Sequence, residues 1–547
     1  MAEEIIKNQS YEVSISGMTS EGSGVAKIDG FAVFVPNTAV GDRLKIKIVK
    51  VLKHYGYGIV QEILTPSPDR IVNHCPVYLQ CGGCCYRHIS YAAELRIKER
   101  QVEDAFLRIG AIPLKPEPIV GSEREEEYRN KAQFPIGLND DRKAVTGFFA
   151  NRSHRIVKCT ECRLLPPVFN AIARDVVRFI NKNRLKVYEE KTGHGVFRHI
   201  YLRQAEYSGE IMLCVVAAQP ELPKEALLVE FITERYPQVK TIVVNHNPDQ
   251  TNVILGRNER VIFGSGVIID RLCDVSVEIS PKAFYQVNRR QAERLYLQAI
   301  DYARLTGDET LFDLYCGIGT IGLSAAGRVR LLVGAEIVPE AVENANRNAR
   351  LNGFSNTRFL CGDCKEAVRQ LEQESIRPDV LIVDPPRKGC DPDVLETIVR
   401  LSPERVVMVS CNPSTAARDC RLLQEQGYRV VKYRPFDLFP RTKHVETVVQ
   451  LVRKKPDTYI DITVDMDELD LTSSEAKATY DEIKDYIFDK HCVKVSSLYI
   501  AQIKQKHGII ERDCYNNSKK DNTTQPQCPP EKVKLIEEAL RHFKMIP

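Results

Sequence analysis

The sequence has no tryptophan, little net charge and no long apolar run. Its 77 lysines and arginines nearly balance its 73 aspartates and glutamates, so a nucleic-acid role would need local basic surface. Nowhere do about eighteen apolar residues follow one another, which excludes an ordinary membrane-spanning helix. The first ten residues, MAEEIIKNQS, lack the basic and apolar regions of a signal peptide, so we expect a cytoplasmic protein.

A chain of 547 residues is too long for one hydrophobic core, so we expect several domains. Alternating strand and helix signals over 291–453 predict a doubly wound α/β sheet, whose ligands bind beyond the carboxyl ends of its strands. The whole chain is predicted to be an α/β multidomain protein. Its expected segments are a small all-β barrel (8–65), a cysteine loop (66–95), a mixed α/β middle region (96–290), the doubly wound region (291–453) and a charged helical tail (456–547).

Two segments give local predictions. In the barrel, RLKIKI (43–48) alternates apolar and basic residues, so Leu44, Ile46 and Ile48 are expected inside, and Lys45 and Lys47 outside. In the tail, a capping box at 472–475 predicts a helix through Ile487. Further helices are predicted from Ser496 or Ser497 to Lys506 and over 531–544. The tail fits either a helix-turn-helix or a docking module.

A glycine-rich loop follows one apolar strand of the doubly wound region. FDLYCGIGTIG (312–322) carries Gly317 and Gly319, which let backbone approach a ligand closely. Acids close the next strands: Glu336, suited to ribose hydroxyls, then Asp363, suited to an adenine amino group, and then Asp384. These acids fit a nucleoside with a positive sulfonium better than a pyrophosphate. The glycine pattern alone also fits an NAD-dependent dehydrogenase or a tight turn.

Five motifs occur in an order that resembles one family. They are ISPKAFYQVN (279–288), DLYCGIGTIGL (313–323), DPPRKG (384–389), SCNP (410–413) and HVETV (444–448). Over residues 8–453 the chain resembles the RNA uracil-carbon-5 methyltransferases, in particular the bacterial 23S rRNA enzymes with an N-terminal TRAM barrel. The resemblance implies a Rossmann-like class I methyltransferase domain, an OB-like RNA-binding β-barrel, a mixed α/β central RNA-binding domain and S-adenosyl-L-methionine as cofactor.

The resemblance also implies roles for individual residues. The expected contacts to S-adenosylmethionine are Gln286, Tyr315, Glu336 and Asp384, with Thr320 and Asp363 as further contacts. Cys411 matches the nucleophile and Glu446 the general base, with His444 as the runner-up. By pattern alone, Cys411 also fits a core cysteine, and His444 and Glu446 fit the polar face of a strand.

This chemistry explains why a thiol and a base are needed. Uracil carbon 5 is too weak a nucleophile to attack a sulfonium methyl unaided. A thiolate that adds to carbon 6 pushes electron density onto carbon 5, and a positioned base later removes the carbon 5 proton. The surroundings of Cys411 are therefore expected to lower its pKa, with Arg387, Lys388 and Arg441 as candidate cations.

The 17 cysteines include a compact cluster. In a reducing cytosol such clusters indicate metal binding or catalysis and not disulfides. HCPVYLQCGGCC (74–85) is followed much later by a pair that offers a fourth ligand, Cys159 and Cys162. The resemblance implies a [4Fe–4S] cluster held by Cys75, Cys81, Cys84 and Cys162. The alternative is zinc held by Cys81, Cys84, Cys159 and Cys162, and the adjacent Cys85 complicates either assignment.

The resemblance favours large-subunit (23S) rRNA as the partner, because the related tRNA enzymes generally lack both the barrel and the cluster. Two alternatives stay open: a tRNA uracil-5 methyltransferase, and a non-catalytic RNA-binding assembly factor. No membrane partner is expected, and the sequence names no protein partner.

Overall fold

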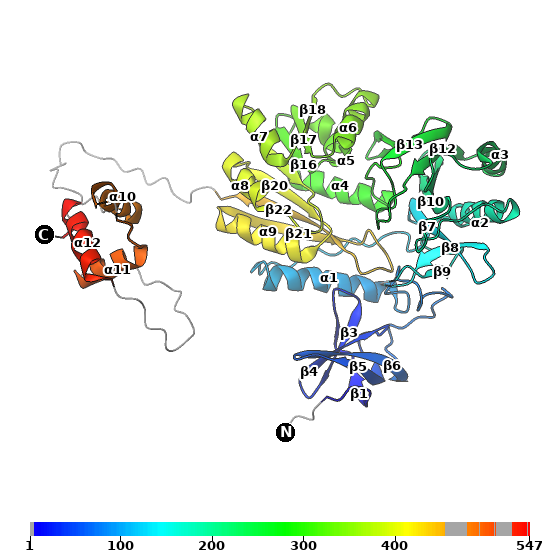
Figure 1. Cartoon of the computed structure of the whole chain (residues 1–547), viewed down its shortest axis with the longest axis horizontal. Helices are drawn as coiled ribbons and strands as arrows, with labels where there is room; N and C mark the ends of the chain where they lie inside the picture. Colours follow the sequence, from blue (N-terminus) through cyan, green and yellow to red (C-terminus); the bar gives the residue numbers. More distant parts are fainter. Residues whose placement is uncertain are drawn as a thin grey trace. The chain divides into compact units, whose positions relative to one another are not determined.

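The computed structural model describes residues 5–454 except 152, and residues 479–546 except 492, 508, 510–527 and 544. The chain divides into two compact units, residues 1–455 and 456–547 (Figure 1). The predicted capping box at 472–475 lies outside the described residues.

The first unit begins with a six-stranded sheet in the order β1-β5-β6-β4-β3-β2. Leu44, Ile46 and Ile48 are fully buried, which confirms the alternation predicted for 43–48. Lys45 is exposed and Lys47 half-buried on the other face of β5. The strands are β1 Ser10–Ser14, β2 Gly17–Met18, β3 Ser23–Ile28, β4 Phe31–Pro36, β5 Arg43–Val51 and β6 Tyr55–Thr65.

Helix α1 (Tyr91–Arg108) follows the cysteine loop and leads into the middle region. That region is built on a seven-stranded sheet in the order β13-β12-β11-β10-β7-β8-β9. The apolar residues of α2 and α3 share one core with this sheet. The elements are β7 Lys131–Leu138, β8 Ala144–Phe149, β9 Ile156–Lys158, α2 Pro167–Lys182, β10 Phe197–Gln204, β11 Ile211–Ala217, α3 Glu225–Arg235, β12 Val239–His246 and β13 Asn258–Phe263, followed by the hairpin β14 Ile268–Leu272 and β15 Val275–Ile279.

The next sheet (Figure 1) has seven strands in the order β18-β17-β16-β19-β20-β22-β21. Its two faces pack into separate hydrophobic cores. β22 alone runs opposite to the other six strands. This is the predicted doubly wound architecture. Its elements are α4 Arg289–Ala303, β16 Thr310–Leu314, α5 Thr320–Ala325, β17 Leu331–Glu336, α6 Pro339–Leu351, β18 Thr357–Cys361, α7 Cys364–Gln373, β19 Val380–Val383, α8 Pro392–Leu401, β20 Arg405–Ser410, α9 Pro413–Glu425, β21 Tyr428–Phe436 and β22 Glu446–Arg453.

The second unit contains α10 (Tyr480–His491), α11 (Ser497–Lys506) and α12 (Pro530–His542). They share a small core that includes Ile487, Ile500 and Ile536. Ser496 caps α11, as predicted, because its hydroxyl accepts a hydrogen bond from the Tyr499 amide. Across the described residues, no helix is both long enough and apolar enough to span a membrane.

Candidate active site

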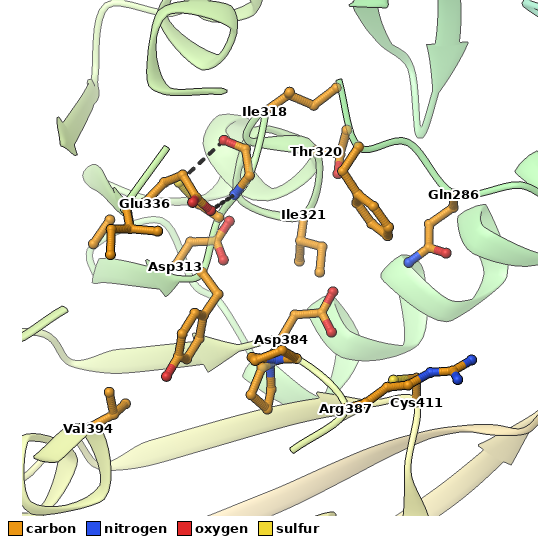
Figure 2. Close-up of a pocket in the computed structure, with 18 of the residues that line it drawn as sticks. Gln286, Asp313, Ile318, Thr320, Ile321, Glu336, Asp384, Arg387, Val394 and Cys411 are labelled. Atoms are coloured by element: carbon orange, nitrogen blue, oxygen red, sulfur yellow. Dashed lines mark hydrogen bonds between the residues drawn. The ribbon is translucent and has the colours of Figure 1, made fainter. Parts of the chain in front are cut away.

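The glycine loop after β16 is fixed by the carboxylate at the end of β17. The Gly317 amide donates to Glu336 Oε2 at 3.0 Å (Figure 2), and the Val338 amide donates to Oε1 at 3.0 Å. Gly319 has φ 82° at the start of α5, a left-handed conformation that glycine adopts without strain. A Cβ on Gly317 would meet nothing within 4 Å, so the loop leaves open space above the strand ends.

A cavity of about 870 Å³ lies at these carboxyl ends. Seven of the predicted cofactor residues line it: Gln286, Tyr315, Gly317, Thr320, Glu336, Asp363 and Asp384. Gly319 does not line it and instead forms the turn into α5. Cys411, His444 and Glu446 line the same cavity, so the predicted cofactor and catalytic residues share one space.

Like Glu336, Asp363 and Thr320 have protein partners of their own. Asp363 caps α7, since its Oδ1 accepts from the Glu366 amide at 2.8 Å. The Thr320 hydroxyl lies 3.2 Å from Tyr296 Oη in the buried wall of the cavity. Gln286 reaches in from the segment before α4, on the side away from Glu336 (Figure 2).

Cys411 directly follows β20, and α9 begins at Pro413. The Asn412 side chain accepts from the Ser414 amide at 3.1 Å and donates to the Arg387 carbonyl at 3.0 Å. Ser410 pairs with Thr447 across β20 and β22, so Cys411 and Glu446 leave these neighbouring strands side by side. The strand ends thus bring the thiol and the predicted base together.

The expectation of a lowered thiol pKa is wrong for this structure. Burial raises the pKa of Cys411 to about 11, and the carboxylates of Glu446 and Asp384 act in the same direction. Arg387 opposes them. Lys388 forms an ion pair with Asp391 at 2.8 Å, and the Arg441 guanidinium bonds to the Ile89 carbonyl and to Glu125.

Three carboxyl groups that line the cavity have raised pKa values. Burial is the first cause in each case, and it raises the pKa of Asp313 and Asp384 to about 7. For Glu446, burial and the nearby Asp384 raise the pKa to about 8, against the effect of Arg387. A carboxyl group with such a pKa can take up and release a proton near neutral pH.

The pKa of His444 is shifted in the opposite direction to that of Glu446. Burial lowers its pKa to about 4, with Arg387 and Lys443 adding to the effect. Its ring nitrogens lie 3.3 Å from Arg387 Nη2, and its ring packs edge-on against Phe439. A neutral imidazole with so low a pKa is a weak proton acceptor, so the geometry favours Glu446 as the base.

Comparison with known proteins identifies the family. Residues 268–454 match the profile of tRNA (uracil-5-)-methyltransferases, and residues 7–60 match that of TRAM domains. An RNA methyltransferase from Halalkalibacterium halodurans is 44% identical over 82% of this chain and 98% of its own, and one from Bacillus cereus is 41% identical over 83% and 98%. The chain belongs to the RNA uracil-C5 methyltransferase family. It is an S-adenosylmethionine-dependent enzyme that acts on RNA.

A solved structure supports the fold of this methyltransferase. The Pyrococcus abyssi tRNA (uracil-54, C5)-methyltransferase in complex with S-adenosyl-L-homocysteine is 26% identical. It superposes with a TM-score of 0.65 over 81% of this chain and 100% of that one. The predicted fold class, with its TRAM barrel and doubly wound methyltransferase domain, is confirmed.

Asp313 and Phe439 are among the residues of the methyltransferase cavity that the sequence did not predict. Asp313 is fully buried in the middle of β16 and accepts from the Gly322 amide at 2.9 Å. Phe439 comes from the segment between β21 and β22. Asp313 begins the motif DLYCGIGTIGL, and an acid inside an apolar strand could have indicated a functional residue there. Nothing in the local sequence indicates a role for Phe439.

The segment that carries Phe439 and His444, residues 437–445, is held from outside the sheet. Lys98 of α1, fully buried, donates to Asp437 and Glu94 at 2.7 Å each, and to the Phe439 carbonyl at 3.2 Å. The Arg441 amide donates to Glu94 at 2.7 Å. We call this set of contacts the α1 clamp.

The cysteine loop adds to the α1 clamp. The amides of Cys85 and Tyr86 both donate to the Arg441 carbonyl, at 2.9 and 3.2 Å. Arg441 has φ 69°, a strained conformation for a residue with a side chain, and its contacts hold it there. The loop therefore bonds directly to the backbone of the segment that precedes Glu446.

A second cavity, of about 260 Å³, gathers the cysteines of the predicted metal site. Its lining includes Cys75, Cys81, Cys84, Cys159 and Cys162, together with Arg87, Arg129, Lys131 and Arg163. Burial raises the pKa of Cys162 to about 12. Within the part of the chain that the structure describes, no three His, Cys, Asp or Glu side chains converge closely enough to hold a metal ion.

Proposed function

We propose that the methyltransferase modifies carbon 5 of a uridine in 23S rRNA through a covalent bond between Cys411 and uracil carbon 6. The observation that carries this is the meeting of Cys411 and Glu446 at the ends of β20 and β22, in the cavity that Asp384 and Glu336 also line. A nucleophile and a proton acceptor on adjacent rigid strands suit a reaction that needs both on one base.

The proposed steps assign a role to each side chain. The Cys411 thiolate adds to carbon 6, and carbon 5 then takes the methyl group. Glu446 accepts the carbon 5 proton, and the electron pair of that C–H bond expels the thiolate from carbon 6. Arg387 favours the ionised thiol, since it is the group that lowers the pKa of Cys411.

S-Adenosylmethionine would supply the methyl group on a positive sulfonium. The proposed contacts are Gln286, Tyr315, Gly317, Thr320, Glu336, Asp363 and Asp384. Asp384 is partly buried, and burial is the only cause that raises its pKa, so no cation of the described chain offsets its charge. A bound sulfonium is the kind of charge that such a carboxylate stabilises.

The domain roles follow the proposed segments. The barrel (8–65) and middle region (96–290) would grip RNA, and the cysteine loop (66–95) would join them to the catalytic domain (291–453). On the barrel, the rings of Phe34, Tyr55 and Tyr57 lie 5.4 to 6.0 Å apart, and Lys50 pairs with Tyr57 across β5 and β6. Aromatic rings beside lysines suit unpaired bases and phosphates.

The cysteine cavity would hold a [4Fe–4S] cluster on Cys75, Cys81, Cys84 and Cys162. Five thiols beside four cations fit an anionic, thiolate-bound cluster in donor type and in charge. Cys159 lines the same cavity and keeps zinc as the alternative. Analysis of iron, sulfide and zinc in protein purified without oxygen separates the two. About four irons and four sulfides per chain support the cluster, and one zinc without sulfide overturns it.

tRNA is the second candidate substrate. The Pyrococcus abyssi neighbour is named for a tRNA uracil, and the matching family profile carries a tRNA name. The resemblance favours rRNA, but the alignment with the tRNA neighbour covers 81% of this chain, so the barrel and the cysteine cavity do not by themselves exclude tRNA.

One experiment tests mechanism and substrate together. Transcripts of 23S rRNA and of tRNA containing 5-fluorouridine are mixed with enzyme and S-adenosylmethionine and run on a denaturing protein gel. Fluorine blocks proton removal, so the methylated adduct stays on Cys411. A shifted band with rRNA that Cys411→Ala abolishes supports the proposal. A shift with tRNA alone overturns the substrate, and no shift with either RNA overturns the covalent route and favours an RNA-binding factor.

A further inference from the structure

An open groove runs over one side of the middle region, between helix α2 and strands β8 and β9. Its volume is about 680 Å³. Four long cationic side chains line it: Lys158, Arg174, Arg178 and Lys182. Neither matching family profile covers this part of the chain, since they span residues 7–60 and 268–454.

The groove has an unusual charge composition for this protein. The whole chain has 77 basic and 73 acidic residues, so a random surface would mix the two signs about evenly. None of the described residues that line the groove is acidic. In the neighbouring cysteine cavity the cations face thiols. In the groove, one cation, Arg178, pairs with a carboxylate of the described chain, that of Asp175, which does not itself line the groove.

The four cations differ in how firmly they are held. Arg178 forms an ion pair with Asp175 at 2.8 Å, and Arg174 donates to the Thr160 carbonyl at 3.1 Å. Lys158 and Lys182 are exposed, and neither forms an ion pair with any described residue. The two lysines are therefore free to meet an external anion.

The place of the groove connects it to the catalytic cavity. Cys159 lines both the groove and the cysteine cavity, and Val287 lines both the cysteine cavity and the catalytic cavity. The three hollows thus adjoin in series. Along α2 the cations extend from Arg174 to Lys182, which is about 12 Å of helix. That length suits several phosphates of one strand better than a single small anion.

We propose that this groove binds the phosphate backbone of the substrate RNA, in the stretch that flanks the methylated uridine. This inference rests on the proposed function for the identity of the RNA. No aromatic side chain lines the groove among the described residues, so the contacts are to phosphates and not to stacked bases. The groove positions RNA and contributes little to sequence preference.

The test uses the full-length chain with Lys158→Gln and Lys182→Gln combined. Binding to labelled 23S rRNA and tRNA transcripts is measured by filter retention from 50 to 300 mM KCl. We expect affinity for the bound RNA to fall about tenfold at 150 mM KCl. The slope of log Kd against log salt should become shallower by about 1.4 to 1.8, because two phosphate contacts are lost.

The matched control is Lys191→Gln with Lys240→Gln, which removes the same charge from exposed lysines elsewhere in the middle region. The control should bind RNA like the wild type. Calorimetric binding of S-adenosylmethionine should be equal in all three proteins and shows that each is folded.

Two results overturn the groove proposal: an unchanged affinity and salt slope in the groove variant, or an equal loss in the control. Failure of the proposed function looks different. In that case the wild type forms no adduct with saturating 5-fluorouridine RNA, whatever the salt dependence of binding. Even if no adduct forms, a loss of RNA affinity in the groove variant but not in the control supports RNA binding by the groove.

Discussion

The two enclosed cavities of the first unit have opposite charge. The catalytic cavity is lined by carboxyl groups, among them Asp313, Glu336, Asp384 and Glu446. The cysteine cavity is lined by cations and thiols, and by no carboxylate of the described chain. One cavity suits a positive sulfonium, and the other suits anionic thiolates. The same chain therefore separates charge over adjoining sites while its total stays near zero.

Of the changes considered, Glu446→Gln in the catalytic cavity should have the largest effect on the rate of methyl transfer. Removing a general base typically costs about 10²- to 10⁴-fold in rate. Because the proton then stays on carbon 5, the Cys411 adduct should accumulate even on RNA with ordinary uridine. A denaturing gel and a methyl-transfer assay measure both effects. In the wild type, the rate should rise with pH until the pKa of Glu446, about 8, is passed, since the carboxylate is the active form.

A variant that lost activity without accumulating adduct would show that Glu446 does not act after the thiol. His444→Gln is the matched control, since it changes a neighbouring side chain of the same cavity. It should lower the rate far less and leave no adduct.

Lys98→Met should have the next largest effect, because it breaks the α1 clamp between the two cavities. Lys98 is fully buried with Glu94 and Asp437, and removing it leaves Asp437 without its cation and Glu94 with Arg441 alone, at 3.8 Å. Loss of one partner of a buried ion pair costs about 3 to 5 kcal/mol of unfolding free energy. Urea unfolding measures this loss.

Arg108→Gln on the same helix is the control, because its pair with Asp104 is exposed and should matter little. If Lys98→Met unfolded at the same urea concentration as the wild type, the clamp would not stabilise the enzyme.

A smaller effect is expected for the pH dependence of S-adenosylmethionine binding, because the cavity contains carboxyl groups that ionise near neutral pH. Burial raises the pKa of Asp384 to about 7, so the group is mostly neutral at pH 6 and ionised at pH 8. A positive sulfonium favours the ionised form. The affinity for S-adenosylmethionine should therefore rise about tenfold from pH 6 to pH 8. S-Adenosylhomocysteine has an uncharged sulfur and should change about twofold or less. Equal pH dependence of the two ligands in calorimetry would contradict the sulfonium role of Asp384.

The smallest effect is expected from deleting residues 456–547. Both cavities lie in the first unit, and the relatives align 98% of their own length with 82 to 83% of this chain. RNA affinity and methylation should stay within about twofold of the full chain, a change close to the resolution of such assays. A larger loss of RNA affinity, with S-adenosylmethionine binding unchanged, would show that the second unit contributes to RNA binding.

The sequence predicted the catalytic domain well because its motifs stand at strand ends. A doubly wound sheet brings such ends to one edge, so residues from 286 to 446 could be assigned to one cavity without coordinates. Short-range patterns also sufficed for the alternation in β5 and for the Ser496 cap of α11.

The strands of the middle region were harder to predict from the sequence, because some of them carry charged residues that are buried. In β10, FRHIYLRQ, the residues Arg198, His199 and Arg203 are almost fully buried. Arg203 donates to the carbonyls of Ser280 and Ala283, partners far along the chain. A pattern based on apolar residues cannot detect a strand whose polar groups are satisfied from a distance. The raised pKa of Cys411 was missed for a related reason, because burial depends on the whole fold.

The bonds from Cys85 and Tyr86 to the Arg441 carbonyl have a consequence for maturation of the enzyme. Glu446 lies only a few residues beyond Arg441, while most of the proposed cofactor contacts lie on other strands. Disorder in the cysteine loop should therefore reach the base before it reaches the methyl-donor site. An immature chain would then still take up its methyl donor and attack RNA, yet release its product slowly. Efficient product release would thus depend on a correctly folded cysteine loop.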